Sequence, residues 1–214
     1  MASLKTAGQT RDNPPAIVDK RGLLERDGGL CLDLGCGNRK LGPEYIGIDL
    51  LDGPQVDVVG DVTDVLERIR PGSVQRVYSS HFLEHVDDVE LVLTRLARAM
   101  ASGGELEVVV PHFSNPYYYS DLTHRTTFGL YTFAYFLSRS PFKRQVPTYG
   151  RNLPFRLTHV TLGFKSSPPF YGRHALKLVA QRIFNASRGM QEFYEENLCY
   201  LVPCYELRYL LVRE

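Results

Sequence analysis

The stretch that most constrains the fold runs from residue 30 to residue 38 and reads Leu-Cys-Leu-Asp-Leu-Gly-Cys-Gly-Asn. It begins as a short apolar run, which is typical of a strand buried on both faces of a sheet. It then turns through Gly35 and Gly37, and glycine lets a ligand lie against the main chain. Because ligands of open α/β sheets bind outside the carboxyl ends of the strands, we expect a small cofactor on this turn, with Asp33 beside it.

The spacing of the glycines argues against a nicotinamide dinucleotide site. The dinucleotide fingerprint reads G-x-G-x-x-G, with an acidic residue about 20 positions further on. Here Lys40 occupies the position of the third glycine, and Asp49 comes only 12 residues after Gly37. A dehydrogenase is therefore disfavoured.

The same stretch resembles the D-x-G-x-G motif of class I S-adenosylmethionine (SAM) dependent methyltransferases. The resemblance covers roughly residues 30–112, and it includes Asp49, Asp61 and the H-x-L-E-H-V run at residues 81–86. Two features depart from the family pattern. Arg39 stands where the family usually has a third glycine, and the short gap before Asp49 leaves little room for a full helix after the first strand.

The resemblance implies SAM as the cofactor and gives each acidic residue a role. Asp49 would accept the ribose hydroxyls, which the Gly35 and Gly37 turn upstream favours over the alternative of an ordinary strand-end turn residue. Asp61 would meet the adenine amino group, with the Val62 N–H nearby, and it could also cap the helix that follows. The implied cofactor site comprises Asp33, Gly35, Gly37, Asn38, Asp49, Leu50, Asp61, Val62, Ser80 and His81.

Apolar periodicity predicts an alternation of strands and helices. This alternation predicts an α/β fold with a doubly wound, mostly parallel sheet. A terminal strand pair would complete the seven strands of the resembled family, with a C-terminal helical and aromatic insertion. We expect one domain over residues 16–214 behind an N-terminal tail, residues 1–15. Expected strands are 30–34, 45–48, 56–59, 74–79, 106–110, 155–164 and 205–212, and expected helices are 16–27, 62–69, 89–100, 126–137 and 174–185.

Composition indicates an ordinary soluble protein of 214 residues, 43% hydrophobic and 23% charged. No stretch has the roughly 18 apolar residues of a membrane helix, and the first 15 residues lack the apolar region of a secretory signal. The four cysteines form neither C-x-x-C pairs nor an evident disulfide framework. We therefore expect a cytoplasmic location.

The net charge of +1 conceals a strong asymmetry. Residues 122–191 contain 11 Lys or Arg and no Asp or Glu, whereas the other 144 residues carry 14 basic and 24 acidic side chains. This split favours an anionic partner for the C-terminal part. The alternative is that the basic part pairs with the acidic part inside the protein.

Methyl transfer from a sulfonium mainly requires alignment of the acceptor, and positioning alone can contribute about 7–11 kcal/mol. A hydroxyl acceptor must also lose a proton, for which histidine is the usual base near neutral pH. We rank His124 first, with Asp121 able to orient it, then His81 and then His112, although a structural role is open for each. The spacing of these four residues requires no metal ion, and we predict none.

Aromatic residues are dense between positions 113 and 136. Core packing explains most of them, but Tyr117, Tyr118 and Tyr119 are consecutive and cannot share one face. At least one of the three is expected near solvent or substrate. We assign acceptor binding to residues 112–153 and 166–200, with contacts from these tyrosines and Arg125.

Small methyltransferases with this H-x-L-E-H-V run, a D-x-T-H segment and a C-terminal E-L strand resemble tailoring enzymes for glycans and secondary metabolites. The resemblance implies O-methylation of a sugar, glycolipid precursor or related small metabolite that is anionic or phosphate-linked. An RNA methyltransferase and a non-catalytic SAM-binding regulator are the alternatives. The basic amphipathic helix at 174–185 could contact an anionic membrane or pack on the sheet, and the sequence leaves monomer and homodimer open.

Overall fold

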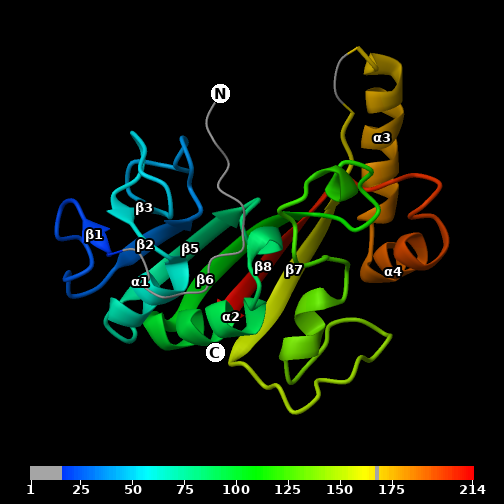
Figure 1. Cartoon of the computed structure of the whole chain (residues 1–214). Coiled ribbons are helices and arrows are strands. Elements are labelled where there is room, and N and C mark those ends of the chain that lie inside the picture. Colours follow the sequence, from blue (N-terminus) through cyan, green and yellow to red (C-terminus); the bar gives the residue numbers. More distant parts are fainter. Residues whose placement is uncertain (1–15, 167–168) are drawn as a thin grey trace.

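The central element of the protein is β2, Leu30–Leu34, every residue of which is buried. The computed structural model describes residues 16–166 and 169–214, so the expected tail lies outside the described residues. Figure 1 shows β2 within an eight-stranded sheet of order β1-β4-β3-β2-β5-β6-β8-β7. The other strands are β1 (Val18–Asp19), β3 (Ile46–Asp49), β4 (Val58–Val59), β5 (Val74–Ser80), β6 (Met100–Pro111), β7 (Phe155–Gly163) and β8 (Glu206–Arg213).

The sheet is mostly parallel, as predicted, and the strand order reverses at β2. This strand pairs in parallel with β3 on one side and with β5 on the other, which creates the kind of switch point at which open α/β sheets bind ligands. The pairs β3–β4 and β5–β6 are also parallel. At the far end, β8 runs antiparallel to both β6 and β7, which completes the predicted seven strands.

The helix expected over residues 16–27 is wrong, because this segment forms β1 and a turn. β1 adds an eighth strand, antiparallel to β4, at the sheet edge. The Asp19 carboxylate accepts hydrogen bonds from the backbone N–H groups of Arg21 (3.2 Å) and Leu24 (2.9 Å), and Gly22 has a φ of +61°. These turn interactions satisfy the backbone locally and compete with a helix.

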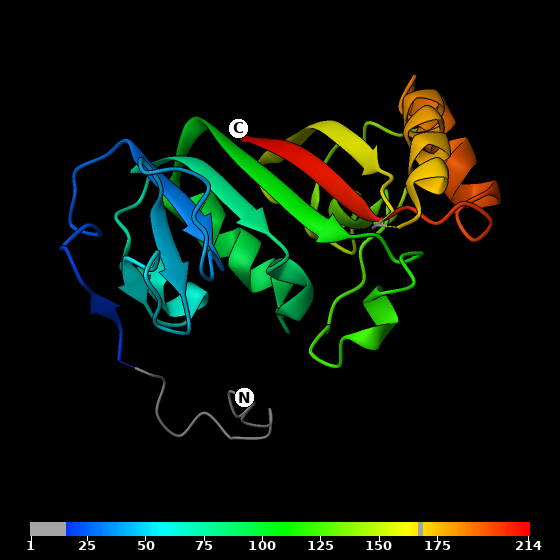
Figure 2. The ribbon, with the colours of Figure 1, turned by 90° about the horizontal axis from the view of Figure 1, so that it is seen from above.

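Two helices pack on one face of the sheet (Figure 2), and both were predicted. They are α1 (Val62–Arg68) and α2 (Val89–Ala99). Each begins at an aspartate whose side chain accepts a backbone N–H: Asp61 from Thr63 and Asp88 from Leu91, both at 2.8 Å.

The two faces of the sheet differ in burial. One row of cross-strand partners is buried throughout, and it lies on the core side beneath the helices: Leu32, Val77, Leu106, Leu211 and Leu157. The row one residue further along lies on the opposite face and becomes more exposed towards β7: Asp33, Tyr78, Glu107, Leu210 and His159.

The connection from β2 to β3 contains no helix, as the short gap in the sequence indicated. It comprises residues 35–45, which form turns and bends. Asp57, placed just before β4, secures it: one carboxylate oxygen accepts from the Gly47 N–H (2.9 Å) and from Lys40 Nζ (2.6 Å). Burial acts to raise the pKa of Asp57, but the Lys40 ammonium and the Gly47 N–H outweigh it and hold this pKa below 3.8.

The helix expected over residues 126–137 is also wrong. Only η3, Thr132–Phe136, is helical there, as a short 3₁₀ segment. Phe128 forms a strand-like bridge with His112 at the end of β6, and its carbonyl accepts the Phe113 N–H. Because its side chain is also fully buried, this extended backbone is fixed by tertiary contacts that periodicity does not reveal.

The predicted C-terminal insertion lies between β7 and β8 and forms one end of the molecule (Figures 1 and 2). It contains α3 (Tyr171–Phe184), close to the predicted helix, and α4 (Arg188–Asn197), which the sequence reading missed. Ser187 caps α4, and Tyr194 anchors it in the core. Among the described residues, none of the helices combines the length and the apolar character needed to cross a membrane.

We predict that the Lys40–Asp57 pair stabilises the helix-free connection. Lys40→Met leaves a largely buried carboxylate with only the more exposed Arg21 guanidinium 3.8 Å away, and the free energy of unfolding should fall by about 3 kcal/mol in urea titrations at pH 7. The exposed Arg70–Asp27 pair is the control, and Arg70→Met should cost less than about 1 kcal/mol.

The loss of stability in Lys40→Met should depend on pH because the pKa of Asp57 is lowered in the folded protein. The stabilisation is fully present above the ordinary aspartate pKa and is lost as the pH falls through the folded-state value. The gap between wild type and Lys40→Met should therefore narrow below about pH 4. An equal gap at pH 7 and pH 3 would contradict this role.

Candidate functional site

The predicted cofactor turn follows β2 and is closed by a side chain from the loop after β5. Gly35 and Gly37 have φ values of +67° and +53°. A Cβ on Gly35 would lie 2.6 Å from the side chain of Phe82, so no larger residue fits there without displacing this ring. Phe82, which the sequence analysis did not single out, thus joins the two loops at the switch point.

Asp49, at the end of β3, holds the turn from the neighbouring strand. Its two carboxylate oxygens accept backbone hydrogen bonds, one from Gly37 (2.8 Å) and the other from Leu51 (3.0 Å). The side chain remains partly exposed. Asp49 therefore fixes the glycine turn and keeps access to solvent, which a contact to a ribose requires.

A cavity of about 270 Å³ opens beside this turn. It brings together the predicted residues Leu50, Asp61 and Val62 with Phe82 and His85. Asp61 is the N-cap of α1, so the simpler of its two sequence interpretations is confirmed. Its contact with adenine stays a prediction. Its lining combines apolar side chains with three carboxylates, those of Asp61, Asp87 and Asp88, and this mixture suits a flat ring with a polar edge.

Three further predicted cofactor residues surround the turn. Asp33 is buried and accepts the Leu41 N–H at 2.7 Å. Burial raises the pKa of Asp33 to about 6, against the opposing effects of this N–H and of Lys40. Asn38 is exposed on the turn, and Ser80 is partly buried at the end of β5.

His81 follows β5 directly and lies between two carboxylates. Its φ of +53° is unusual for a residue other than glycine. Its Nδ1 is 3.2 Å from Glu84 Oε1, and its Nε2 is 3.6 Å from Glu206 Oε2. Hydrogen bonding to Glu206 and then to Glu84 raises the pKa of His81 to about 9. Glu206 also pairs with Lys165 at 2.7 Å.

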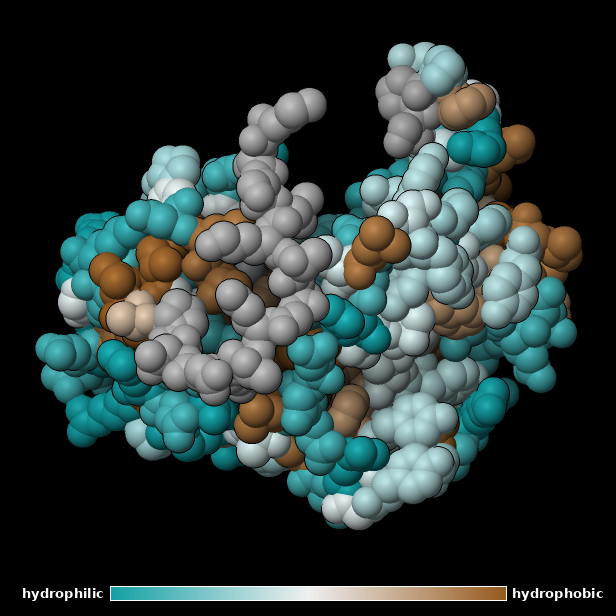
Figure 3. Space-filling model, in the orientation of Figure 1, coloured by the Kyte–Doolittle hydropathy of each residue, from teal (hydrophilic) through white to brown (hydrophobic). Residues whose placement is uncertain are grey.

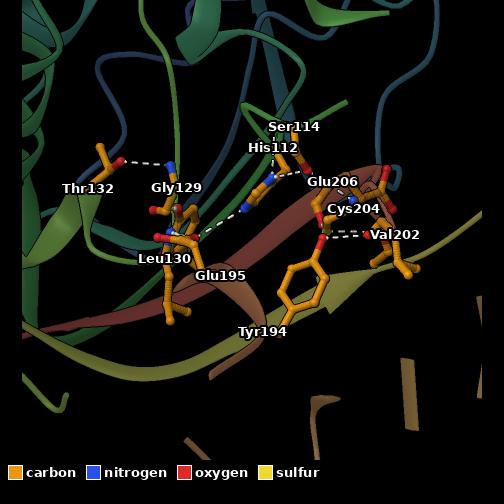
Figure 4. A network of polar contacts seen from close by, with 12 residues as sticks. His112, Ser114, Gly129, Leu130, Thr132, Tyr194, Glu195, Val202, Cys204 and Glu206 are labelled. Atoms are coloured by element: carbon orange, nitrogen blue, oxygen red, sulfur yellow. Dashed lines mark hydrogen bonds and ion pairs between the residues drawn. The ribbon is translucent and has the colours of Figure 1, made fainter. Parts of the chain in front are cut away.

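His112 lies in the protein interior, in the polar network of Figure 4. The Ser114 N–H donates to its Nδ1 (3.0 Å), so the hydrogen is on Nε2, which is 3.1 Å from Glu195 Oε2. The same glutamate oxygen accepts the Leu130 N–H. The Nε2 contact holds α4 against the end of β6, and the Nδ1 contact stays within the loop after β6. Both ring nitrogens of this buried side chain are thus engaged inside the protein.

His124 lies in the loop after β6, with one ring nitrogen engaged and the other free. Its Nδ1 donates to the Tyr118 carbonyl (2.8 Å). Its Nε2 is 3.8 Å from Asp121, so the expected orienting contact is loose. The His124 ring packs between the tilted rings of Tyr118 and His85, with centroid distances of 4.7 and 4.9 Å. The structure therefore groups His124 with His85 rather than with His81 or His112.

The three consecutive tyrosines diverge, as their spacing requires. Tyr118 is buried beside His124, whereas Tyr117 and Tyr119 are exposed. Arg125 is half exposed and lies 3.8 Å from Asp87.

A second cavity, of about 550 Å³, lies between the loop after β6, the end of β7, α3 and the chain leading into β8. Three cationic side chains line it, Lys165, Arg173 and Lys177, and none of the acidic side chains that the structure describes does. Lys177 Nζ donates to the carbonyls of Lys165 and Pro203, both at 3.2 Å. Burial, followed by the charge of Arg173, lowers the pKa of Lys177. The cavity is therefore suited to an anionic group.

Comparison with known proteins identifies the fold. Residues 32–108 match a family model described as a methyltransferase domain. Residues 32–108 therefore carry a methyltransferase domain, in agreement with the resemblance to class I SAM-dependent methyltransferases. This match supports an enzyme that transfers a methyl group, with SAM as the cofactor that the resemblance implies. No curated protein matches the sequence.

Solved methyltransferase structures share this architecture. A SAM-dependent methyltransferase from Archaeoglobus fulgidus is 18% identical, with 87% of each chain covered and a TM-score of 0.56. A putative sarcosine dimethylglycine methyltransferase from Galdieria sulphuraria is 14% identical, with 90% of this chain and 80% of that chain covered and a TM-score of 0.50. At these identities the likeness shows the fold alone.

The matched residues include the predicted cofactor site but not the second cavity. The glycine turn, Asp49, Asp61 and His81 lie within residues 32–108, whereas the 550 Å³ cavity and α3 lie outside them. Sequence reasoning missed Glu206 and Lys165 because no spacing connects them to His81. Glu84 and His85 were inside the H-x-L-E-H-V run, but nothing in the sequence gave them a role.

Asp49→Ala should weaken binding of S-adenosylhomocysteine, the demethylated cofactor, by about 1.5–3 kcal/mol in calorimetric titration. This is the range for hydrogen bonds to a charged group, and the variant also releases the Gly37 N–H. Asp27→Ala, on an exposed aspartate elsewhere, is the control. We expect no binding of NAD. Unchanged affinity in Asp49→Ala would place the ribose elsewhere.

Proposed function

We propose that this methyltransferase transfers the SAM methyl group to a hydroxyl of a small anionic acceptor. The acceptor class is a sugar, a glycolipid precursor or a related metabolite with a phosphate or similar group. The observation that supports this is the 550 Å³ cavity, whose charged lining is entirely cationic. Its lining comes from the two regions predicted to bind the acceptor, from Lys165 directly before the second region, and from residues 201–205 directly after it.

A chain of charged groups leads from this cavity to the end of β5. Lys165 lines the cavity and pairs with Glu206, which in turn lies beside His81. We place the acceptor along this chain, with its anionic group at Lys165, Arg173 and Lys177 and its hydroxyl towards His81. Holding the acceptor at one end in this way would supply alignment with the methyl group, the largest requirement of the reaction.

We place SAM on the opposite side of His81. Its adenine would occupy the 270 Å³ cavity beside Asp61, and its ribose would meet Asp49. The sulfonium would then lie near Gly35 and the end of β5. There the Phe82 ring lies so close to Gly35 that no larger residue fits at position 35. This arrangement leaves the methyl group facing the acceptor.

Removal of the acceptor proton is assigned to His124. Both nitrogens of His81 face carboxylates, and both nitrogens of His112 are engaged inside the protein. The Nδ1 hydrogen of His124 is held by the Tyr118 carbonyl, which leaves the Nε2 lone pair free. General base catalysis of this kind typically contributes 10²–10⁴-fold to the rate.

The proposed activity is tested with labelled SAM and a metabolite extract separated on an anion-exchange column. Label should appear in the retained, anionic fraction, and the KM of the purified acceptor should rise with salt because ionic screening weakens the cationic cavity. His124→Asn should lower kcat about 10²–10⁴-fold with unchanged SAM affinity. His159→Asn, on the exposed side of β7, is the control.

Two alternatives predict other results in the same experiment. An RNA methyltransferase would label RNA and bind it in a salt-sensitive way. A non-catalytic regulator would bind SAM and label nothing. Either result would contradict the proposed function.

The surface of α3 favours an additional contact with an anionic membrane, where lipid-linked acceptors reside. Only Phe184 of this helix is buried, and Leu176 is 72% exposed. Figure 3 shows apolar surface at the side of the molecule that carries α3 and α4. Apolar side chains next to Arg173 and Arg182, without any acidic residue in the helix, are typical of helices that lie on lipid headgroups.

Sedimentation with vesicles tests this contact. The protein should sediment with vesicles that contain phosphatidylserine and not with pure phosphatidylcholine vesicles. Arg182→Gln should weaken the partition by about 1 kcal/mol, the contribution of one basic residue near an anionic surface. Arg68→Gln, on an exposed part of α1, should have no effect. Equal sedimentation with both vesicle types would exclude an electrostatic contact.

A further inference from the structure

Three metal-binding side chains meet beside the cofactor cavity. Glu84 and His85 belong to η1, Leu83–His85, a 3₁₀ turn after β5, and His124 comes from the loop after β6. One ligand atom from each of the three lies within 4.8 Å of the others. The set for which we predicted no metal ion is a different one, His81, His112, Asp121 and His124, and among the described residues its ligand atoms do not converge.

The hydrogen bonds of the two histidines determine which nitrogen is free. His124 Nδ1 donates to the Tyr118 carbonyl. His85 Nδ1 is 2.9 Å from Thr123 Oγ1, whose single hydrogen goes to Asp121 Oδ1 at 2.6 Å. That hydroxyl can then only accept from His85, so Nδ1 carries the hydrogen in both rings. Both Nε2 lone pairs are available, as in histidine metal ligands whose other N–H is held by a carbonyl or hydroxyl.

Glu84 supplies a carboxylate oxygen that no other group satisfies. The residue is 1% exposed. Its Oε1 faces His81, whereas Oε2 is buried and has no hydrogen-bond partner among the described residues. A buried carboxylate oxygen without a partner is costly, and a cation would remove that cost. The Glu84 carbonyl also accepts from the N–H groups of Arg125 and Thr126, which holds the loop of His124 against η1 without any ion.

We propose that Glu84, His85 and His124 bind a divalent transition-metal ion, with Zn²⁺ as the best match. Two imidazole nitrogens and one carboxylate oxygen form the ligand set of zinc sites that keep an open position. Imidazole ligands favour such ions over Mg²⁺ and Ca²⁺. His85 is exposed and also lines the 270 Å³ cavity, so the ion can enter from solvent.

The metal site adds a role for the ion in the proposed O-methylation, and that role rests on the proposed function. With the ion bound, His124 Nε2 is a ligand, so His124 acts through the ion in place of taking the proton itself. The acceptor hydroxyl would bind at the open position, where a metal ion lowers its pKa. The hydroxyl proton goes to water. The oxygen then forms the new O–CH₃ bond as the S–CH₃ bond breaks, and the bonding pair stays on sulfur to give S-adenosylhomocysteine.

Metal binding is measured directly on the chelator-treated, dialysed full-length protein. Calorimetric titration with Zn²⁺ should give one equivalent, and Co²⁺ should give visible d–d absorption of a bound ion. His85→Asn and His124→Asn should each weaken Zn²⁺ binding on the order of 100-fold. Loss of a ligand should cost at least as much as loss of a hydrogen-bond partner of a ligand, which typically costs about 10–100-fold. His159→Asn should bind as wild type does.

Thr123 tests the hydrogen-bond argument itself. Thr123→Val removes the acceptor for His85 Nδ1 and should weaken Zn²⁺ binding about 10–100-fold, whereas Thr123→Ser keeps the hydroxyl and should restore it. Circular dichroism and S-adenosylhomocysteine affinity verify that each variant is folded.

Absence of one-to-one binding, or binding unchanged in both His85→Asn and His124→Asn, would overturn the metal site. Full kcat after chelation, with His124→Asn still inactive, would overturn the role of the ion in the reaction while leaving the proposed O-methylation intact. Zn²⁺ bound at the three residues by a protein that methylates no acceptor would support the site and contradict the proposed function.

Discussion

Three carboxylates on or next to neighbouring strands hold the connection on which the cofactor turn depends. Asp33 accepts the Leu41 N–H, Asp49 accepts the Gly37 N–H, and Asp57 binds both Gly47 and Lys40. Backbone donors in a segment without a helix or strand need such partners. Because these side chains replace the order that a helix would give, the glycine turn is rigid enough to present a surface to a cofactor.

The antiparallel strand β8 explains how the two halves of the site meet. A strand that runs against its neighbours begins at the edge of the sheet where the parallel strands end. Glu206, the first residue of β8, therefore pairs across to Pro111 at the end of β6 and to Gly163 at the end of β7. A Cβ on Gly163 would lie 2.8 Å from the Glu206 side chain. This close approach places the carboxylate between His81 and Lys165 and joins the cofactor side to the basic cavity.

Sequence patterns predicted the elements that are determined by neighbouring residues. They did not predict the conformation of segments that is determined by contacts with residues far away in the sequence. The strand at Leu30–Leu34 and the caps Asp61 and Asp88 follow from apolar runs and side-chain chemistry, and the structure contains them. The segment around Phe128 is shaped instead by its bridge to the end of β6. Likewise, Glu195 fixes His112 from 83 positions away in the sequence. No spacing rule relates such pairs, so the grouping of the histidines required the fold.

The central claim is that SAM occupies the switch point of the sheet and faces an acceptor site beyond His81. A crystal structure with S-adenosylhomocysteine tests it most directly. The adenine should lie in the 270 Å³ cavity between Leu50 and Phe82, with the ribose hydroxyls on Asp49 and the sulfur towards His81. Ligand in the basic 550 Å³ cavity, or an empty switch point at saturating ligand, would contradict the claim.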